Sequence, residues 1–446
     1  MEKTADIAVI GAGIAGLTCA YRLTRAGYSV DVYEREQSPG GRMRTRATGG
    51  MSFDLGANFL VASYSSLLEL ADELEVEYLN LSPVPHVFYR AGCWHSMNLA
   101  TLRDLIRLDG LKLWDRLKLL EFYLSIHRKY PKLDFFDLST VPDEFNRENA
   151  YDFALQAVGC GFADYLVDAF HSCMMFYRAR ETSVAAFLSL FQLKTAPGSN
   201  FCILHARHEM QQLPNALAER LNVKRGHAVE DLRRQGSGWQ LRCGGEEKSY
   251  PYVVLATTAG AAREILQEGP SRHLDLLRAT RYASTVNLAY RIRKEALGGT
   301  HCFYVPYVES QIVAEFTNEA LKGEHLVQDG WSLLNAGLHE SAALELDHLS
   351  DEELFQTVGK EVRRLMPSLE ELEPFDLQRW SEAIPKYDVG HVARVKEFLG
   401  SGQGEDGLYL CGDYLNAPWL EGASRCGSRV AEALARQIQT SSPVSS

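Results

Sequence analysis

The chain has 446 residues, of which 46% are hydrophobic and 23% charged, and its formal net charge is −12. This composition is typical of a globular protein of about two or three domains and excludes disorder on a large scale. The acidic balance excludes a general binder of nucleic-acid backbones. No apolar run reaches the ~18–20 residues of a transmembrane helix, and the N-terminal segment lacks a signal-peptide arrangement. We therefore predict a cytoplasmic protein.

The nine cysteines are scattered along the chain, without a C-x-x-C pair or a spacing typical of zinc sites. This pattern predicts reduced core cysteines, with no disulfide framework and no metal site.

The first residues carry a dinucleotide-binding pattern. A short apolar strand over 6–10 runs into Gly11, Gly13 and Gly16 and then into a helical pattern. Gly11 permits a tight turn, Gly13 lets a pyrophosphate approach the helix N-terminus, and Gly16 allows close helix–strand packing. Glu34 ends the second strand, at the position where an acid bonds the ribose hydroxyls.

A second turn follows at Gly40-Gly41-Arg42, in which the glycines expose backbone N–H groups and the arginine can neutralise phosphate. The stretch MSFDLGANF comes next, at 51–59. The succession GxGxxG, E-x(5)-GGR and FD-x-GA resembles the flavin-containing amine oxidoreductase superfamily, which includes monoamine oxidases, protoporphyrinogen oxidases and phytoene-type desaturases. The resemblance implies a Rossmann-like FAD-binding domain of the GR2 type, joined to a discontinuous α+β substrate domain.

The resemblance also implies which residues contact the cofactor. The acid binds the ribose of FAD, the GGR turn lies near the pyrophosphate, and the FD-x-GA loop approaches the isoalloxazine. A Gly-Asp pair near the C-terminus contacts the ribityl–pyrophosphate portion, and the following helix points at the flavin's pyrimidine end. These roles fall on Gly11, Gly13, Ala15, Gly16, Glu34, Arg35, Gly40, Gly41, Arg42, Ala57, Asn58, Val229, Gly412, Asp413, Glu421 and Gly422.

The middle of the chain is predicted to be largely helical, because it lacks strand alternation. Helices are expected at 65–75, 111–127, 151–177 and 183–193. The 111–127 helix interleaves Leu, Trp and Phe with Lys, Arg and Asp. This amphipathic pattern is typical of a helix that packs one face on a core, and also of one that lies on a membrane surface. Both interpretations stay open, as does the oligomeric state.

Strand patterns return in the second half of the chain. A helix leads to a strand centred on Val229, whose backbone is expected at the adenine; in the superfamily this segment usually opens with Gly-Gly, here replaced by His208-Glu209. The segments predicted as strands are 237–243, 251–260, 284–292 and 301–307, with a helix over 351–366. We expect the FAD domain to comprise 1–61, 206–280 and 396–439, the substrate domain 62–205 and 281–395, and a disordered tail 440–446.

Two features bear on amine oxidation. Members of the amine oxidase branch typically carry a lysine linked through water to the flavin, whereas 284–292 has none and the matching position is Asn287 or a neighbour. The region that holds a flavin-attaching cysteine in monoamine oxidases reads NAPWLEG, and Cys411 and Cys426 are expected in the core, so non-covalent FAD follows. Four aromatic side chains are pocket candidates for an amine or for any flat apolar substrate: Trp380, Tyr387, Tyr414 and Trp419.

The stretch IPKYDVGHVARV, at 384–395, resembles protoporphyrinogen oxidases, whereas the GDY…EGA ending resembles phytoene-type desaturases. His391 is expected to bond backbone at the domain junction rather than act as a base, and His171 and His227 are expected to be structural. No second GxGxxG follows a strand, so electrons would come from the substrate and pass to oxygen or a quinone. These patterns predict an FAD-dependent oxidase or desaturase acting on a small hydrophobic or aromatic substrate. The alternatives are a flavin amine oxidase and a redox-neutral isomerase, dehydroxylase or non-catalytic flavin binder.

Overall fold

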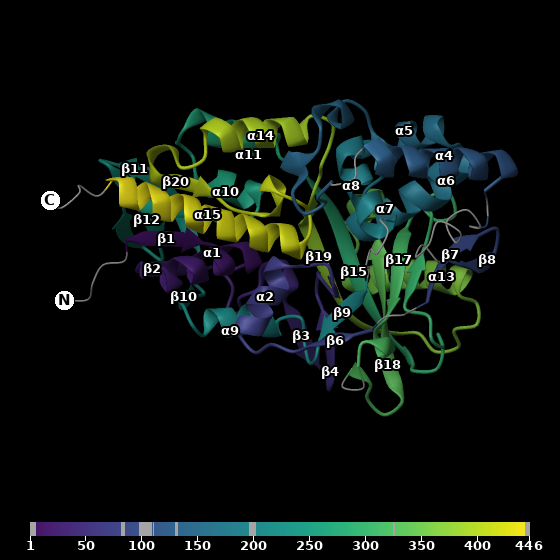
Figure 1. Ribbon diagram of the computed structural model, residues 1–446. Coiled ribbons are helices and arrows are strands. Elements are labelled where there is room, and N and C mark those ends of the chain that lie inside the picture. Colours follow the sequence, from purple (N-terminus) through teal and green to yellow (C-terminus); the bar gives the residue numbers. More distant parts are fainter. Residues whose placement is uncertain are drawn as a thin grey trace.

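The computed structural model describes residues 6–81, 85–97, 109, 111–129, 133–195, 202–323 and 326–441. Two large sheets organise this part of the chain, one parallel and one mainly antiparallel. Figure 1 shows the parallel sheet near the two chain ends and the larger sheet toward the opposite end of the molecule, with helices beside both. The predicted α/β architecture is confirmed.

The parallel sheet has five strands with small and β-branched residues at its centre. Their order is β10 (Asn222–Arg225), β2 (Val30–Glu34), β1 (Ile7–Ile10), β14 (Tyr252–Leu255) and β20 (Leu408–Leu410). Helices α1 (Ile14–Arg25) and α15 (Leu420–Ser441) lie side by side on it (Figure 1). Gly427 permits this contact, because a Cβ there would lie 2.4 Å from the carbonyl oxygen of Ala15. Three distant segments thus build one sheet.

The second sheet has seven strands, all paired antiparallel except β16 and β7. Their order is β19 (Glu373–Pro385), β15 (Tyr282–Arg293), β18 (Trp331–Leu338), β17 (Val313–Asn318), β16 (Cys302–Tyr304), β7 (His86–Arg90) and β8 (Cys93–Ser96). The stretch 62–205, predicted to be largely helical without strand alternation, also contains short strands: β7 and β8 in this sheet, and β6 (Tyr78–Asn80) and the start of β9 (Ile203–Ala206) in another. β7 is paired on both sides and β8 forms the edge of the sheet; the hairpin joins the sheet because β16, more than 200 residues later in the chain, pairs with β7.

Helices cover one side of this sheet: α4 (Leu113–Lys129), α5 (Ala150–Ala157), α6 (Cys160–Phe162), α7 (Ala169–Met175) and α8 (Val184–Thr195). The single helix predicted over 151–177 is interrupted at Gly159, whose φ is +147°, and by a π-helical turn over Ala163–Asp168. On α4, Leu119, Phe122 and Ile126 are buried, so packing of one face on a core is confirmed. None of the described helices combines the length and apolarity needed to cross a membrane.

The remaining elements connect the two sheets. The additional strands are β3 (Thr45–Thr48), β4 (Met51–Asp54), β5 (Leu60–Val61), β6 (Tyr78–Asn80), β9 (Ile203–Ala206), β11 (Val229–Gln235), β12 (Gly238–Cys243) and β13 (Glu246–Tyr250). The additional helices are α2 (Ser66–Glu73), α9 (Gln212–Ala218), α10 (Ala259–Ile265), α11 (Ser271–Ala279), α12 (Glu340–Glu345), α13 (Asp351–Leu365) and α14 (His391–Ser401). Helix α15 continues into the start of the predicted tail, and 442–446 lies outside the described residues.

Candidate functional site

One cavity of about 710 Å³ runs between the two large sheets. It begins beside the ends of β1 and β2 and continues over the seven-stranded sheet to Glu315. Most of the residues predicted to contact the cofactor line it: Gly11, Gly13, Ala15, Glu34, Arg35, Gly40, Gly41, Arg42, Ala57, Asn58, Val229, Gly412 and Asp413. Gly16, Glu421 and Gly422 are not among the lining residues.

The first end of the cavity is a turn held by a buried carboxylate. Glu34 is 7% exposed, and its carboxylate accepts hydrogen bonds from the backbone N–H groups of Ala12 at 2.8 Å and Glu36 at 2.9 Å. A Cβ on Gly13 would meet nothing within 4 Å, whereas one on Gly16 would lie 2.1 Å from the carbonyl oxygen of Gly11. Gly13 therefore faces open space, and Gly16 serves the packing of α1.

The GGR turn comes next along the wall. Gly40 and Gly41 have φ values of +114° and +54°, a left-handed conformation that favours glycine. The guanidinium of Arg42 forms an ion pair with Asp413, with its nearest nitrogen–oxygen distance 2.8 Å, and also donates to the carbonyl oxygen of Ala383 at 2.7 Å. Burial alone would lower the pKa of Arg42, but Asp413 outweighs it and raises that pKa. Arg42 therefore stays charged and fixed beside the cavity.

The FD-x-GA loop is fastened to the seven-stranded sheet and to the GGR turn. The carbonyl oxygen of Leu55 accepts bonds from Asn287 Nδ2 at 3.0 Å and from Trp380 Nε1 at 2.7 Å. The backbone N–H of Ala57 donates to the carbonyl oxygen of Arg42 at 2.8 Å. Asn287, which stands where the amine oxidase branch has its lysine, thus orients this loop; no lysine is among the described residues that line the cavity.

Aromatic side chains form part of the wall, as predicted for Trp380 and Trp419. Trp419 lies at the start of α15 and packs edge-on against Phe135, with ring centroids 4.9 Å apart, and against Phe59 at 6.3 Å. Phe59 also lines the cavity. These rings give the middle of the cavity an apolar surface.

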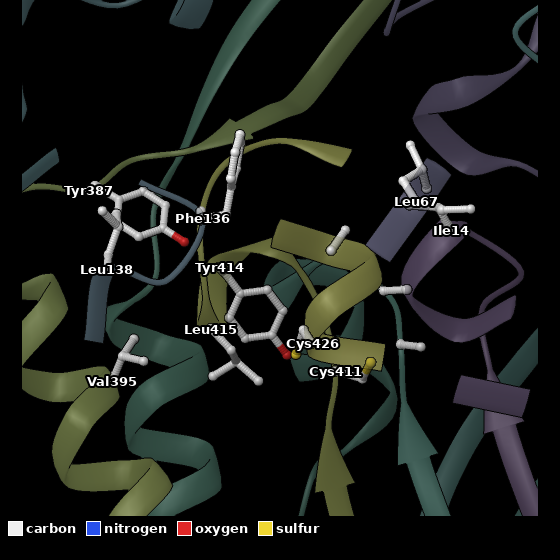
Figure 2. Packing of buried hydrophobic residues seen from close by; sticks show 14 of the residues in the cluster. Ile14, Leu67, Phe136, Leu138, Tyr387, Val395, Cys411, Tyr414, Leu415 and Cys426 are labelled. Carbon is white, nitrogen blue, oxygen red and sulfur yellow. The ribbon is translucent and has the colours of Figure 1, made fainter. Parts of the chain in front are cut away.

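Two other aromatic candidates are wrong, because their side chains point into the core. Tyr414 is completely buried, and Figure 2 shows its ring directed toward Cys426 and Cys411. Tyr387 is 1% exposed and its hydroxyl donates to the carbonyl oxygen of Asp413. Neither residue lines the cavity. Both cysteines are buried beneath the wall, as expected.

The assignment of Glu421 to the cofactor is also wrong. Its side chain is completely buried and turns away from the cavity toward the first turn of α2. It accepts hydrogen bonds from the backbone N–H groups of Ser65, Ser66 and Leu67 at 3.0, 2.9 and 2.9 Å, and from Arg425 Nε at 2.7 Å. A carboxylate at a helix N-terminus satisfies donors that lack partners within that helix. Glu421 therefore caps α2.

Gly422 does not reach the cavity either. A Cβ at this position would lie 2.3 Å from the carbonyl oxygen of Ala417, so the glycine lets the preceding loop approach α15 closely. Leu420 and Ala423 occupy the cavity wall at this end of the helix.

The three histidines considered in the sequence differ in position: two are buried in the core and one lines the cavity. His391 is 1% exposed and its Nε2 lies 2.8 Å from the carbonyl oxygen of Tyr414, so the expected backbone bond is confirmed. Burial lowers the pKa of His391 to about 4 and that of His171 to about 3. His227, expected to be structural, lies on the cavity wall next to Val229.

The far end of the cavity contains polar residues that the sequence did not indicate. Burial raises the pKa of Glu315 to about 8, although Lys322 acts in the opposite direction. Around it the wall includes His86, Cys173, His301, Cys302, Thr317 and Asn335. Glu315 and Thr317 alternate with Ala314 and Phe316, but the strand Val313–Asn318 is buried along its whole length, so that alternation does not mark a face exposed to solvent.

Comparison with known proteins identifies a family that matches most of this chain. A model of the flavin containing amine oxidoreductases matches residues 14–435. The 4,4'-diapophytoene desaturase (4,4'-diaponeurosporene-forming) of Staphylococcus haemolyticus strain JCSC1435 is 33% identical over 84 residues, which are 18% of this chain. That match spans only 17% of the relative's length.

Solved structures share the fold at low sequence identity. Putrescine oxidase bound to putrescine superposes with a TM-score of 0.76 at 18% identity, covering 97% of this chain and 99% of that one. A protein of Exiguobacterium sp. 255-15, assigned by its name as a protoporphyrinogen oxidase, gives a TM-score of 0.76 at 16% identity, covering 98% and 99%. These matches confirm the fold predicted from the flavin-binding motifs.

The family match confirms the expected FAD cofactor, and the cavity wall fits a dinucleotide. The open space over Gly13 leaves room for a pyrophosphate at the N-terminus of α1. The carboxylate of Glu34, fixed by two backbone N–H groups, keeps lone pairs for ribose hydroxyls. The residues that would hold FAD therefore follow one another along a single wall.

Proposed function

The chain belongs to the flavin containing amine oxidoreductase family, and on that premise we propose that it is an FAD-dependent oxidase or desaturase. It removes a hydride from a small hydrophobic or aromatic molecule, of the kind represented by porphyrinogens, polyenes and secondary metabolites. The observation that carries this proposal is the continuity of one cavity from the ribose-binding acid Glu34 to the aromatic wall at Trp380 and Trp419. A substrate on that wall would lie beside the loop that carries Ala57 and Asn58.

When bound along this wall, FAD would supply the hydride-accepting redox chemistry, with oxygen or a quinone as the final electron acceptor. The chain's residues bind and orient. Asn287 and Trp380 hold the carbonyl of Leu55 and thereby the loop that carries Ala57 and Asn58. The N-terminus of α15 faces the same region through Leu420 and Ala423, and its dipole favours negative charge there.

The wall also determines which substrates fit. Phe59, Trp380 and Trp419 offer flat apolar surface in the middle of the cavity, which suits ring systems and conjugated chains. Since Trp419 is braced by Phe135, its ring is positioned before a substrate binds. Pre-positioning reduces the entropy cost of binding.

Oxidation of an amine is the second candidate function, and Glu315 is the observation that favours it. Its buried carboxyl group lines the far end of the cavity, where a substrate ammonium would find a partner. The lack of lysine in 284–292 counts against the typical amine oxidase arrangement. A redox-neutral reaction is the remaining alternative.

Anaerobic mixing of the FAD-loaded protein with a porphyrinogen, a polyene and a set of amines separates these functions. Bleaching of the visible flavin absorption by the first two classes is the expected result. Bleaching only by amines, with ammonia and peroxide released in air, supports the second candidate. Turnover without bleaching would refute both. Trp419→Leu should lower kcat/KM for the true substrate, whereas the core variant Tyr414→Phe should leave it unchanged.

A further inference from the structure

Three metal-ligating side chains meet at the far end of the cavity. Cys173 comes from α7, Cys302 from β16 and Glu315 from β17, and all three are buried. The two Sγ atoms are 3.9 Å apart, and one donor atom of each residue lies within 4.8 Å of the others. We propose that these residues bind one thiophilic divalent cation of the Zn²⁺ type. The proposal does not depend on flavin chemistry.

The sulfur–sulfur distance agrees with zinc coordination. Two thiolates bound at ~2.3 Å in tetrahedral geometry are about 3.8 Å apart, which is close to the observed 3.9 Å. A zinc–oxygen bond of about 2.0–2.2 Å then requires only a small inward movement of the carboxylate. Soft thiolate ligands select Zn²⁺ over Mg²⁺ and Ca²⁺.

The sheet places two of the ligands on one face. Cys302 is opposite Thr317, and Tyr304 is opposite Glu315, in the antiparallel pair of β16 and β17. Since residues two apart on a strand share a face, the side chains of Cys302 and Glu315 are diagonal neighbours. Helix α7 packs on both strands and brings Cys173 to the same face.

Two features of the surroundings point to a ligand. Glu315 is 8% exposed, and no hydrogen bond or ion pair joins its carboxylate to another described residue. Lys322, whose charge acts on Glu315, forms its ion pair with Glu319 at 2.7 Å. Gly337 gives the carboxylate room, because a Cβ there would lie 3.0 Å from Glu315 Oε1. Burial disfavours the ionised carboxylate at this position, and a bound cation would stabilise its charged form.

The second feature is His301, which is 1% exposed and lines the same cavity with neither ring nitrogen hydrogen-bonded. Its imidazole adds a nitrogen that could serve as a metal ligand at this end of the wall. Three protein ligands facing a cavity leave a fourth position for water or for a nitrogen, sulfur or oxygen of a bound molecule. The sequence did not predict a metal site because its ligands come from distant segments rather than from one short motif.

Metal content tests the proposal in the FAD-loaded protein. The reduced protein, stripped with a chelator and dialysed against Zn²⁺, should retain one zinc per chain by elemental mass spectrometry. Co²⁺ in its place should give visible d–d bands at wavelengths beyond the flavin absorption. Cys302→Ser and Cys173→Ser should each lower zinc affinity by more than about a hundredfold, beyond the loss typical of residues that only support ligands. Cys243→Ser, which changes a buried thiol on β12 outside the cavity, is the matched control.

A second measurement needs no variant. Zinc should protect Cys173 and Cys302 from alkylation in the wild-type protein while leaving the exposed Cys93 reactive, as peptide mass spectrometry would show. The proposal is overturned if the stripped protein retains no zinc, or if Cys302→Ser binds it as tightly as wild type. It is equally overturned if Glu315→Gln weakens amine binding while neither thiol affects any ligand, because the occupant is then a substrate ammonium.

Discussion

Two buried glutamates that the sequence analysis assigned to the same cofactor should differ in what their replacement by glutamine weakens. Glu34 lines the cavity, whereas Glu421 caps α2 from the start of α15. Replacing each by glutamine removes a charge and one acceptor oxygen while preserving the shape. We expect Glu34→Gln to weaken FAD binding, and Glu421→Gln to weaken the fold.

The magnitude for Glu421→Gln follows from its partners. The side-chain oxygen of glutamine can still accept from Ser65 and Ser66, but its NH2 group then faces the backbone N–H of Leu67, which the carboxylate now accepts at 2.9 Å. An unsatisfied buried donor costs about 1–3 kcal/mol, and the lost charge opposite Arg425 adds to it. We expect the free energy of unfolding to fall by about 3 kcal/mol. For a chain of 446 residues, this loss lowers the midpoint of thermal unfolding by about 3 °C.

The magnitude for Glu34→Gln concerns affinity. A hydrogen bond from a ribose hydroxyl to a carboxylate contributes about 1.5–3 kcal/mol, so the Kd for FAD should rise about 10–100-fold. Glutamine is preferable to alanine here, because its oxygen keeps an acceptor for one of the N–H groups of Ala12 and Glu36, whereas alanine would leave both without one. The NH2 group faces the other N–H, so Glu34→Gln also lowers the free energy of unfolding by about 1–3 kcal/mol, and FAD affinity is the measurement that separates the two variants.

The assay combines two measurements on both deflavinated variants: thermal unfolding by circular dichroism, and titration with FAD followed by flavin fluorescence. The reasoning is refuted if Glu421→Gln keeps the wild-type midpoint but loses FAD affinity as strongly as Glu34→Gln. That result would mean that Glu421 faces the cofactor.

Three further outcomes are expected. Gly13→Val should leave the unfolding midpoint nearly unchanged but abolish FAD retention, because the valine side chain fills only the open space where the pyrophosphate would bind. Gly16→Ala should instead destabilise the fold, because its Cβ meets the Gly11 carbonyl oxygen. Melting curves and flavin absorbance measure both effects, and equal effects of the two variants would contradict the separate roles of the two glycines. Tyr414→Phe should be neutral or stabilising by up to ~1 kcal/mol in denaturant titrations, since it removes a buried hydroxyl with no hydrogen-bond partner. Burial lowers the pKa of His391 to about 4, so its contribution to the free energy of unfolding is fully present above the unfolded pKa of about 6.5 and falls by about 3 kcal/mol as the pH drops from there to 4. Denaturant titrations at both pH values should show a smaller loss of stability for His391→Gln than for the wild type. An equal loss in both proteins would contradict this cause.

The flavin-binding half was predictable because its motifs are local. Gly11, Gly13 and Glu34 lie on a single strand–turn–helix–strand unit, so their spacing alone indicates where their groups meet. Parallel strands buried on both faces read as short apolar runs, which identified β1 and β14 in the same way.

The substrate half was less predictable because tertiary contacts decide which way its side chains point. Tyr387 and Tyr414 are aromatic, as pocket candidates should be, yet their rings point into the core. Glu421 lies at a helix start that does reach the cavity, but its own side chain points to α2. Glu315 occurs in a strand whose neighbours are all buried, and only the packing of α7 shows that its face borders a cavity.

The order of the parallel sheet has a consequence for biosynthesis. β1 and the glycine turn are translated well before β14 and β20, which complete the sheet on that side. Helix α2 likewise receives its cap from Glu421, near the last part of the described chain to be made. A nascent chain that has exposed only its glycine turn therefore lacks the surface that retains a dinucleotide. We therefore expect the dinucleotide to be retained only after β14 and β20 have been synthesised and have joined β1 in the sheet.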